Sequence, residues 1–251
     1  MWSNDREVTA MTANTKFSFE RYEKKFFLTP QQQEIFIDYI KDYTVSDVYG
    51  KYSLCNIYYD TDDWKLIRAS LEKPVYKEKL RVRSYGVPEK QGKVFVEIKK
   101  KFDGVVYKRR IDMTADKVED YLSGKNTDCC DSQIGSEIQW FQKLYHAKPK
   151  VYIGYDRIAF AGIEDPELRI TFDTNLRWRE TNLDLTKGDY GQLIIPRDKV
   201  LMEVKIPGAC PMWLAAILTE LELYSTSFSK YGTVYRDFIL KNNLKEARLS
   251  A

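Results

Sequence analysis

The chain has 251 residues, of which 43% are hydrophobic and 31% are charged, and this balance is typical of a globular protein with a sizeable core. No stretch approaches the roughly 18 to 20 apolar residues that span a bilayer, so we expect no transmembrane helix. The net charge of only +3 does not favour a nucleic-acid-binding protein. A single histidine, His146, argues against chemistry that needs a histidine base, and the lack of any Cys-x-x-Cys pair argues against a zinc site.

The two ends of the chain differ in character from the rest. Residues 1–16 are polar and contain no apolar signal-peptide core, so we expect a disordered leader there. One domain is expected over residues 17–243, followed by a short tail over residues 244–251. The four cysteines form no disulfide-like pattern, which favours reduced thiols and a cytoplasmic protein.

Six segments carry helix signals. In the first, Thr29 is suited to cap a helix and Pro30 to its first turn. In chain order the predicted helices span residues 31–43, 62–71, 115–122, 132–145, 211–224 and 229–241.

Eight segments between these helices have β character. In chain order they span residues 19–28, 54–60, 76–85, 93–101, 105–113, 150–161, 167–173 and 199–206. Asp103-Gly104 predicts a hairpin that joins two of the strands directly. Strands and helices do not alternate regularly, which argues against a doubly wound parallel sheet.

Charged residues recur at positions i and i+2 in the middle of six strands, as in Arg81 and Arg83. Such a pair lies on one face of the strand, and the apolar residue between its members points to the other face. Within any one strand this pattern is typical of an ordinary half-exposed strand. Over six strands it favours a barrel with a charged lumen and an apolar outer surface under helices. We therefore predict an α+β fold, a closed antiparallel β-barrel of about eight strands with peripheral helices. The apolar partners are Val82, Ile98, Ile170, Phe172 and Val204.

The predicted lumen is strongly basic. Its ten basic side chains are Lys25, Arg81, Arg83, Lys99, Lys108, Arg110, Arg157, Arg169, Lys205 and Lys230. Four carboxylates accompany them: Glu23, Glu97, Asp173 and Glu203. The excess of positive charge would be costly to enclose without a polyanion. Arginine forks match phosphate oxygens, and carboxylates among such bases are typical ligands of Mg²⁺ or Mn²⁺. The pattern therefore predicts a site for a triphosphate or polyphosphate with a divalent metal.

The same motifs resemble those of the triphosphate tunnel metalloenzymes, and more closely the VTC domain, the catalytic domain of vacuolar transporter chaperone polyphosphate polymerases. Many tunnel enzymes begin with Glu-x-Glu-x-Lys, whereas Arg21 stands at the first of these positions here, which favours the VTC type over hydrolases and cyclases. The matching stretches are residues 21–26, 54–60, 80–86, 96–99, 155–157, 168–173, 201–205 and 228–231.

The resemblance implies roles for single residues. Glu203 would hold the metal, with Glu23 and Glu97 as further candidates. Lys108 is aligned across a short hairpin, so Arg110 could exchange roles with it. The phosphate-binding and catalytic residues would be Lys25, Arg81, Arg83, Lys99, Lys108, Arg157, Arg169, Lys205 and Lys230.

The resemblance also implies an activity. We expect a cytoplasmic, Mn²⁺- or Mg²⁺-dependent polyphosphate polymerase that transfers the γ-phosphate of ATP to a growing chain and releases ADP. A hydrolase of tripolyphosphate or nucleoside triphosphate on the same scaffold, or a non-catalytic polyphosphate-binding module, are the alternatives. The expected partners are ATP and polyphosphate or pyrophosphate, not nucleic acid. The sequence leaves open a separate membrane-protein partner and the oligomeric state.

Overall fold

The computed structural model of the protein describes residues 21–103, 105–126 and 132–242. The expected leader (residues 1–16) and tail (residues 244–251) lie wholly outside the described residues, so neither prediction is tested. Within the described part, no helix has both the length and the apolar character needed to cross a membrane.

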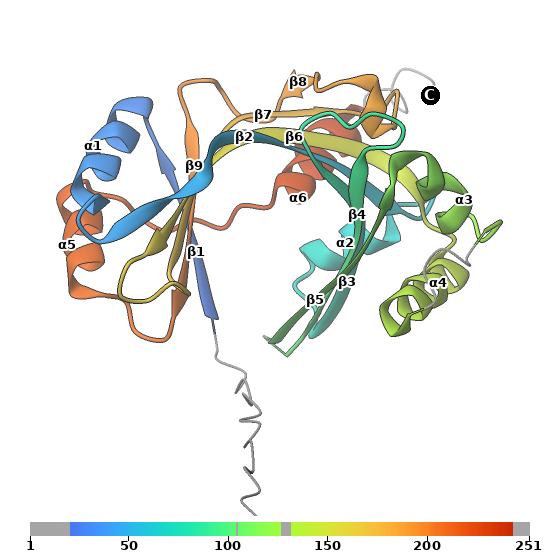
Figure 1. Ribbon diagram of the computed structural model, residues 1–251, viewed down its shortest axis with the longest axis horizontal. Coiled ribbons are helices and arrows are strands. Elements are labelled where there is room, and N and C mark those ends of the chain that lie inside the picture. The colour runs from blue at the N-terminus through green and yellow to red at the C-terminus, as the bar shows by residue number, and fades with distance from the viewer. Residues whose placement is uncertain (1–20, 104, 127–131, 243–251) are drawn as a thin grey trace, which may run out of the picture.

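One antiparallel sheet organises the described residues (Figure 1), in the order β1-β9-β7-β6-β2-β3-β4-β5, with β8 paired to β7. Each neighbouring pair of strands is antiparallel, as the sequence predicted. The strands are β1 (Arg21–Leu28), β2 (Thr44–Asp60), β3 (Tyr76–Tyr85), β4 (Lys93–Phe102), β5 (Val105–Thr114), β6 (Lys148–Gly162), β7 (Arg169–Arg179), β8 (Gln192–Leu193) and β9 (Val200–Pro207).

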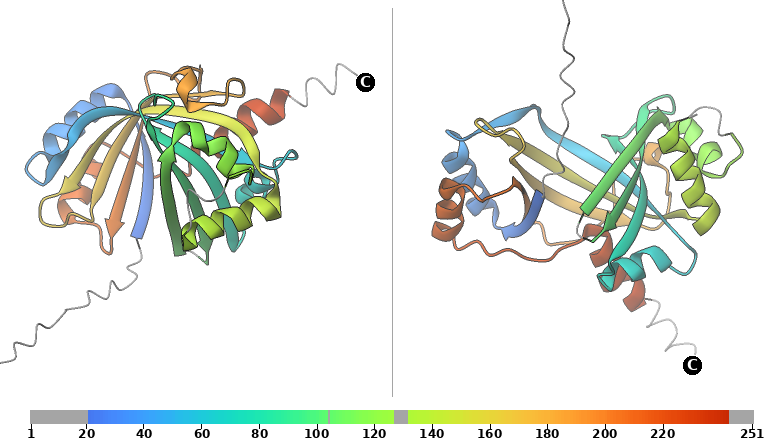
Figure 2. Two further views of the ribbon diagram at one scale, coloured as in Figure 1. Left: turned by 45° about the vertical axis from the view of Figure 1, so that its right-hand side comes forward. Right: turned by 90° about the horizontal axis from the view of Figure 1, so that it is seen from below.

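The predicted closure of the barrel is not shown by the hydrogen bonding. β1 and β5 are the two edges of the sheet, and the described residues include no pairing between them. Part of the free edge of β1 is used instead by the segment before α6 (Lys230–Val234), because the Thr226 amide donates a hydrogen bond to the Lys25 carbonyl. The sheet is therefore an arch, with β2, β6 and β7 across its top (Figures 1 and 2).

Helices cover the outer face of the arch at both ends, as expected. At one end, α1 (Pro30–Ile40) and α5 (Met212–Glu220) pack on β7 and β9 through a cluster that contains Phe36 and Leu214. At the other end, α3 (Val118–Leu122) and α4 (Gln133–Tyr145) cover β3 and β4. The five apolar residues between the charged pairs are all buried there: Val82, Ile98, Ile170, Phe172 and Val204.

One helix does not lie where the sequence predicted. The predicted helix 229–241 is the short α6 followed by a π-helical turn, Tyr235–Ile239. Tyr231 and Val234 pack on Leu54, Tyr58 and neighbouring residues on the inner face of β2, β6 and β7. Figure 1 shows α6 below the arch, near α2 (Lys65–Leu71). α6 is therefore not peripheral, and it places Lys230 on the inner face.

Two strands extend well beyond their predicted bounds. β2 begins at Thr44 rather than at residue 54, and β7 continues to Arg179 rather than ending at residue 173. The additional half of β2 is mostly exposed and pairs with β6 across an irregular register between Ser46 and Lys51. Since this part lacks a regular buried face, its sequence carries little strand signal. β4 and β5 pair directly as far as Phe102 and Val105, as the predicted hairpin requires, and Gly104 of the predicted turn lies outside the described residues.

Candidate functional site

Register brings the predicted lumen residues onto one face of the sheet. Directly opposed residues in neighbouring strands share a face, and so do residues at i and i+2. The pairings Lys25 with Glu203, Arg157 with Asp173 and Arg81 with Glu97 connect the two ends of the arch through β2. All nine predicted basic residues located in strands lie on this inner face: Lys25, Arg81, Arg83, Lys99, Lys108, Arg110, Arg157, Arg169 and Lys205.

Five charged residues form one compact group, here the Glu203 cluster: Lys25, Arg157, Asp173, Glu203 and Lys230. The Lys230 Nζ lies 2.8 Å from Glu203 Oε1 and 2.6 Å from Asp173 Oδ2. The Arg157 guanidinium donates two hydrogen bonds, of 2.6 and 2.7 Å, to the fully buried carboxylate of Asp173. Burial opposes the ionisation of Glu203, but Lys230, Lys25 and Arg157 outweigh it and hold the pKa of that carboxyl well below its usual range. The Glu203 carboxylate is therefore ionised at neutral pH.

A second group, the Glu97 cluster, consists of Arg81, Arg83, Glu97 and Lys108. The Glu97 side chain is only 2% exposed, and its Oε2 accepts a 2.8 Å hydrogen bond from Arg81 Nε. Arg83 Nε and Lys108 Nζ lie 3.8 and 3.0 Å from the same carboxylate. Against the effect of burial, these three cations lower the pKa of Glu97 to about 2. Three cations share one carboxylate, so this cluster keeps a positive charge.

Tyr155 lies between the two clusters. Its hydroxyl accepts a 3.4 Å hydrogen bond from Arg83 Nη2, and its ring centroid is 4.5 Å from Lys230 Nζ and 5.2 Å from the Arg157 guanidinium. The clusters are therefore parts of one site. Two of its aromatic side chains, Tyr155 and Tyr58, are almost fully buried among the cations.

The two halves of the arch also face each other electrostatically. Burial is the largest cause that lowers the pKa of Lys79 in β3 and of Lys205 in β9. Lys25 in β1 adds to the first shift, and Lys99 in β4 adds to the second. Charges interact in this way only at short range, since water and salt screen them beyond about 10 Å. Basic side chains therefore line the inner face of the arch, which has β1 and β9 on one side and β3 to β5 on the other. Figure 2 shows these two sets of strands at opposite ends of the sheet.

Several basic residues of the inner face have no ion pair among the described residues. Unlike the cations of the two clusters, they are not neutralised by a carboxylate and can bind an added anion. They are Lys79, Lys99, Arg110, Arg169 and Lys205.

Lys79 was not predicted from the sequence. Burial is the largest cause that lowers the pKa of Lys79, and the positive charges of Lys77, Lys99 and Lys25 act in the same direction. Together they outweigh the opposite effect of Tyr58 and lower this pKa to about 8. Tyr58 was expected to be a packing residue, yet its hydroxyl accepts a 3.1 Å hydrogen bond from Arg81. Burial raises its pKa, but Arg81, Arg83 and Lys79 outweigh burial and lower that pKa to about 8.

Asn56 and Asp173 are further site residues whose contacts were not apparent from local sequence. Asn56 is buried and accepts a 2.9 Å hydrogen bond from Arg83 Nε, which orients that guanidinium. Asp173 was included in the predicted lumen, but nothing in the sequence links it to Arg157 or Lys230. The only available signal for Asn56 and Tyr58 is their alternation along β2, which places them on the same face.

The Glu203 cluster can accommodate a divalent metal better than the Glu97 cluster can. The described residues contain no group of three or more His, Cys, Asp or Glu side chains positioned to hold a metal. Glu23 and Glu203 nevertheless flank one position, since Lys25 Nζ lies 3.3 Å from Glu23 and 3.8 Å from Glu203. One or two carboxylates suffice for Mg²⁺ when phosphates supply the other ligands. Glu97 fits a metal less well, because it is only 2% exposed and its cluster contains no second carboxylate.

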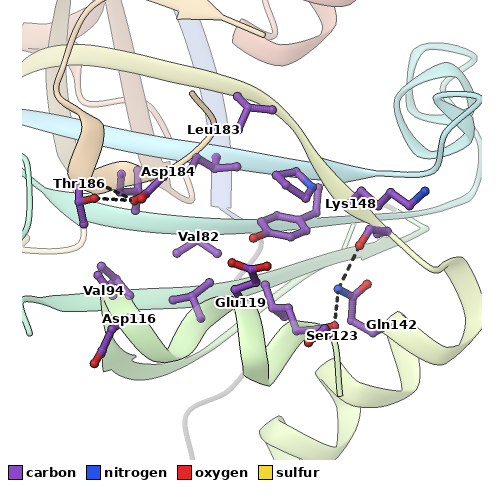
Figure 3. Close-up of a pocket in the computed structure, with 18 of the residues that line it drawn as sticks. Val82, Val94, Asp116, Glu119, Ser123, Gln142, Lys148, Leu183, Asp184 and Thr186 are labelled. Carbon is purple, nitrogen blue, oxygen red and sulfur yellow. Dashed lines mark hydrogen bonds between the residues drawn. The ribbon is translucent and has the colours of Figure 1, made fainter. Parts of the chain in front are cut away.

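A cavity of about 950 Å³ lies on the opposite, outer face of the sheet (Figure 3). Its lining includes Ile57 and Val82, which alternate with Tyr58 and Arg81 along the same strands, and α3 contributes Glu119. None of the predicted phosphate-binding residues lines it. His146 does, so the only histidine of the sequence lies on the outer side and not in the basic site.

Solved structures with a similar arrangement share little sequence with this chain. A proposed adenylate cyclase of Bacillus halodurans matches with a TM-score of 0.49 and 11% identity, covering 84% of this chain and 95% of its own. A proposed adenylate cyclase of Vibrio parahaemolyticus matches with a TM-score of 0.47 and 12% identity, covering 87% and 99%. A proposed adenylyl cyclase of Hippeastrum, described as having a dominant triphosphatase activity, matches with 0.46 and 17%, covering 86% and 94%. At these scores the similarity supports no statement about chemistry.

Comparison with sequence families is decisive. No curated protein matches the chain. The model of the VTC domain matches residues 20–239, which include every strand and helix of the arch. This match confirms the resemblance inferred from the charged motifs, and the chain belongs to the VTC domain family.

Proposed function

We propose that this protein is a polyphosphate polymerase that transfers the γ-phosphate of ATP to a growing polyphosphate chain. The observation that carries the proposal is the basic inner face, where two ion-pair clusters meet at Tyr155 and a set of unpaired cations lies on the same face. Membership of the VTC domain family supports an activity on phosphate chains. A cytoplasmic location and closure of the arch into a tunnel around the substrate belong to the same proposal.

The paired and unpaired cations have different roles. Carboxylates orient one set of cations, so the positions of these side chains are set before substrate arrives. Glu97 holds Arg81, Arg83 and Lys108, whereas Asp173 and Glu203 hold Arg157 and Lys230. The other cations lack such partners among the described residues and take their counterion from the phosphate chain. They are Lys99, Arg169, Lys205 and Arg110. Positioning and charge stabilisation are what phosphoryl transfer chiefly requires from a protein.

The transfer needs no protein base. A terminal phosphate oxygen of the growing chain attacks the γ-phosphorus, the bond from that phosphorus to the β,γ-bridging oxygen breaks, and ADP departs with the electron pair. The attacking oxygen is already ionised near pH 7. A reaction without a protein base agrees with the position of His146, the only histidine of the sequence, on the outer face.

A divalent ion, Mn²⁺ or Mg²⁺, held by Glu203 with Glu23 and by substrate phosphates would supply positive charge to the oxygens of the reacting phosphate. Lys25, which lies between these two carboxylates, would then release them and move toward phosphate.

The first test is incubation of the purified protein with ATP and Mn²⁺, followed by a gel stained for polyphosphate and a measurement of ADP. We expect polymer and ADP from the wild type. Glu203→Gln should reduce polymer formation at least about 100-fold. The lost carboxylate charge holds the metal and Lys230, and these two cations stabilise the transition state. Glu34→Gln, an exposed change on α1, should leave the rate unchanged.

The products separate the alternatives. Free phosphate without polymer would indicate the hydrolase, which differs only in using water as acceptor. Binding of polyphosphate without either product would refute catalysis and leave the non-catalytic module. Unimpaired polymer synthesis by Glu203→Gln would exclude this carboxylate from the reaction.

A further inference from the structure

Three aromatic side chains lie on the inner face beside the phosphate-binding residues, where β3 ends. We call Tyr52, Tyr85 and Phe95 the aromatic ladder. Ring centroids are 5.8 Å apart between Tyr52 and Tyr85, and 5.9 Å apart between Tyr85 and Phe95. Tyr85 continues the face of Arg81 and Arg83 at the next i+2 position, so the ladder is contiguous with the Glu97 cluster.

Register links the ladder to both clusters. Phe95 is directly opposite Arg83 in β3, and Tyr52 is directly opposite Arg157 in β6. A molecule with phosphates between the clusters could therefore extend a ring onto the ladder without leaving the inner face.

Exposure distinguishes Tyr85 from the packing aromatics of the same face. Tyr58 and Tyr155 are 8% and 3% exposed, as expected for side chains that fill space. Tyr85 is 55% exposed, although it lies on the inner face next to the largely buried Arg83. An aromatic side chain that leaves half its surface in water beside an anion site offers a ring to a ligand.

A cation completes the arrangement. The Arg110 guanidinium lies over the Phe95 ring, 4.6 Å from its centroid, and has no ion pair among the described residues. Aromatic rings combined with arginine planes form the usual stacking platform for a nucleobase, whose π face requires no specific hydrogen bonds.

From these contacts we propose that the aromatic ladder, with Arg110, is a nucleobase-binding site that stacks the base of the nucleotide while its triphosphate lies along the basic face. The proposal deepens the proposed function and rests on it. An inorganic phosphate chain has no ring, so the ladder distinguishes the nucleotide donor from the growing polymer. The donor would enter at the Tyr85 end, leaving the Lys79 and Lys99 end for the chain.

The test compares two ligands that share phosphates but differ in the base. Binding of ATP and of inorganic tripolyphosphate, each with Mg²⁺, is measured by calorimetry for the wild type, Tyr85→Ala and Tyr85→Phe. Loss of one stacking contact should weaken ATP binding by roughly tenfold in Tyr85→Ala. Tripolyphosphate affinity should change less than about twofold, and Tyr85→Phe should retain ATP affinity because it keeps the ring.

Tyr107→Ala is the matched control, because Tyr107 is 50% exposed on the outer face of the neighbouring edge strand and should affect neither ligand. Equal weakening of both ligands by Tyr85→Ala would overturn the base site and assign Tyr85 to the phosphate site or the fold. No change in ATP affinity would also overturn it. Wild-type binding of tripolyphosphate without ATP would refute the ladder while leaving a polyanion site, whereas binding of neither ligand would refute the proposed function as well.

Discussion

At the residue scale, pairing decides what each cation of the inner face can do. Arg157 and Arg81 are fixed by buried carboxylates, so each contributes a charge at a defined position. Lys79 and Lys99 are opposed across β3 and β4 and have no carboxylate partner among the described residues. The burial of Lys79 near other cations has a direct consequence for the pH dependence of anion binding.

We predict that tripolyphosphate affinity, measured without metal, depends on the protonation of Lys79. With a pKa of about 8, well below the usual value near 10.4, this lysine is charged at pH 7 and loses its proton as the pH rises to 9. A ligand that binds only the charged form then loses roughly tenfold in affinity over this range. Lys79→Arg stays charged and should remove that loss.

The ratio of wild-type to variant affinity isolates Lys79, because the titration of the ligand itself is common to both proteins. Calorimetry between pH 7 and pH 9 gives this ratio. Lys24→Arg, an exposed change in β1, should retain the wild-type profile. Parallel profiles for Lys79→Arg and the wild type would show that Lys79 does not titrate in this range.

At the element scale, α6 is too short to hold itself in place, and side-chain hydrogen bonds fix it on the inner face. Ser229 caps its first turn by accepting a hydrogen bond from the Gly232 amide. The Tyr231 hydroxyl donates a 2.8 Å hydrogen bond to the buried carboxylate of Asp60 at the end of β2. Asp60 also accepts hydrogen bonds from the Leu66 and Ile67 amides, so one carboxylate joins α6, β2 and α2.

We predict that Tyr231→Phe lowers the free energy of unfolding by about 1 to 3 kcal/mol, since a buried charged acceptor loses a donor. The melting temperature should fall by about 2 to 4 °C per kcal/mol. Polymer synthesis should also weaken, because Lys230 begins the helix that Tyr231 anchors. Tyr107→Phe, an exposed change, is the control for thermal unfolding, and equal melting temperatures for both variants would mean that the Asp60 contact contributes nothing.

At the scale of the whole molecule, the two halves of the arch present like charges to each other. No strand pairing among the described residues joins β1 to β5, and Lys25 and Lys205 face Lys79 and Lys99. A bound polyanion would replace this repulsion by attraction to both halves. Binding should therefore stabilise the fold.

We predict that tripolyphosphate at about 100 times its dissociation constant stabilises the protein by about 2.7 kcal/mol. Differential scanning calorimetry should show a rise of roughly 5 to 10 °C in the melting temperature, which diminishes as NaCl is added. The double variant Lys99→Ala and Lys205→Ala, which removes one unpaired cation from each half, should show a much smaller rise. A rise that is insensitive to salt and equal in the variant would contradict an electrostatic site on this face.

Local sequence was sufficient for the features that depend on alternation along a strand. The bounds of β3 agree with those predicted, because a run of alternating charged and apolar residues defines both its length and its faces. The same alternation placed Arg81 and Arg83 on one face and buried Val82 on the other. The charged motifs were also sufficient to identify the family, since they occur as short stretches in the same order along the chain as in that family.

Tertiary structure alone decided which of these charges meet. Arg157 and Asp173 are 16 residues apart, and Lys230 and Glu203 are 27 apart, so their ion pairs arise from register and from the place of α6. Closure of the sheet was predicted from the sequence but is not shown by the hydrogen bonding. Closure depends on which segment pairs with the free edge of β1, and Thr226 pairs with Lys25 there. Sequence period determines the face on which a side chain lies, whereas long-range pairing determines its partner, its burial and hence its charge.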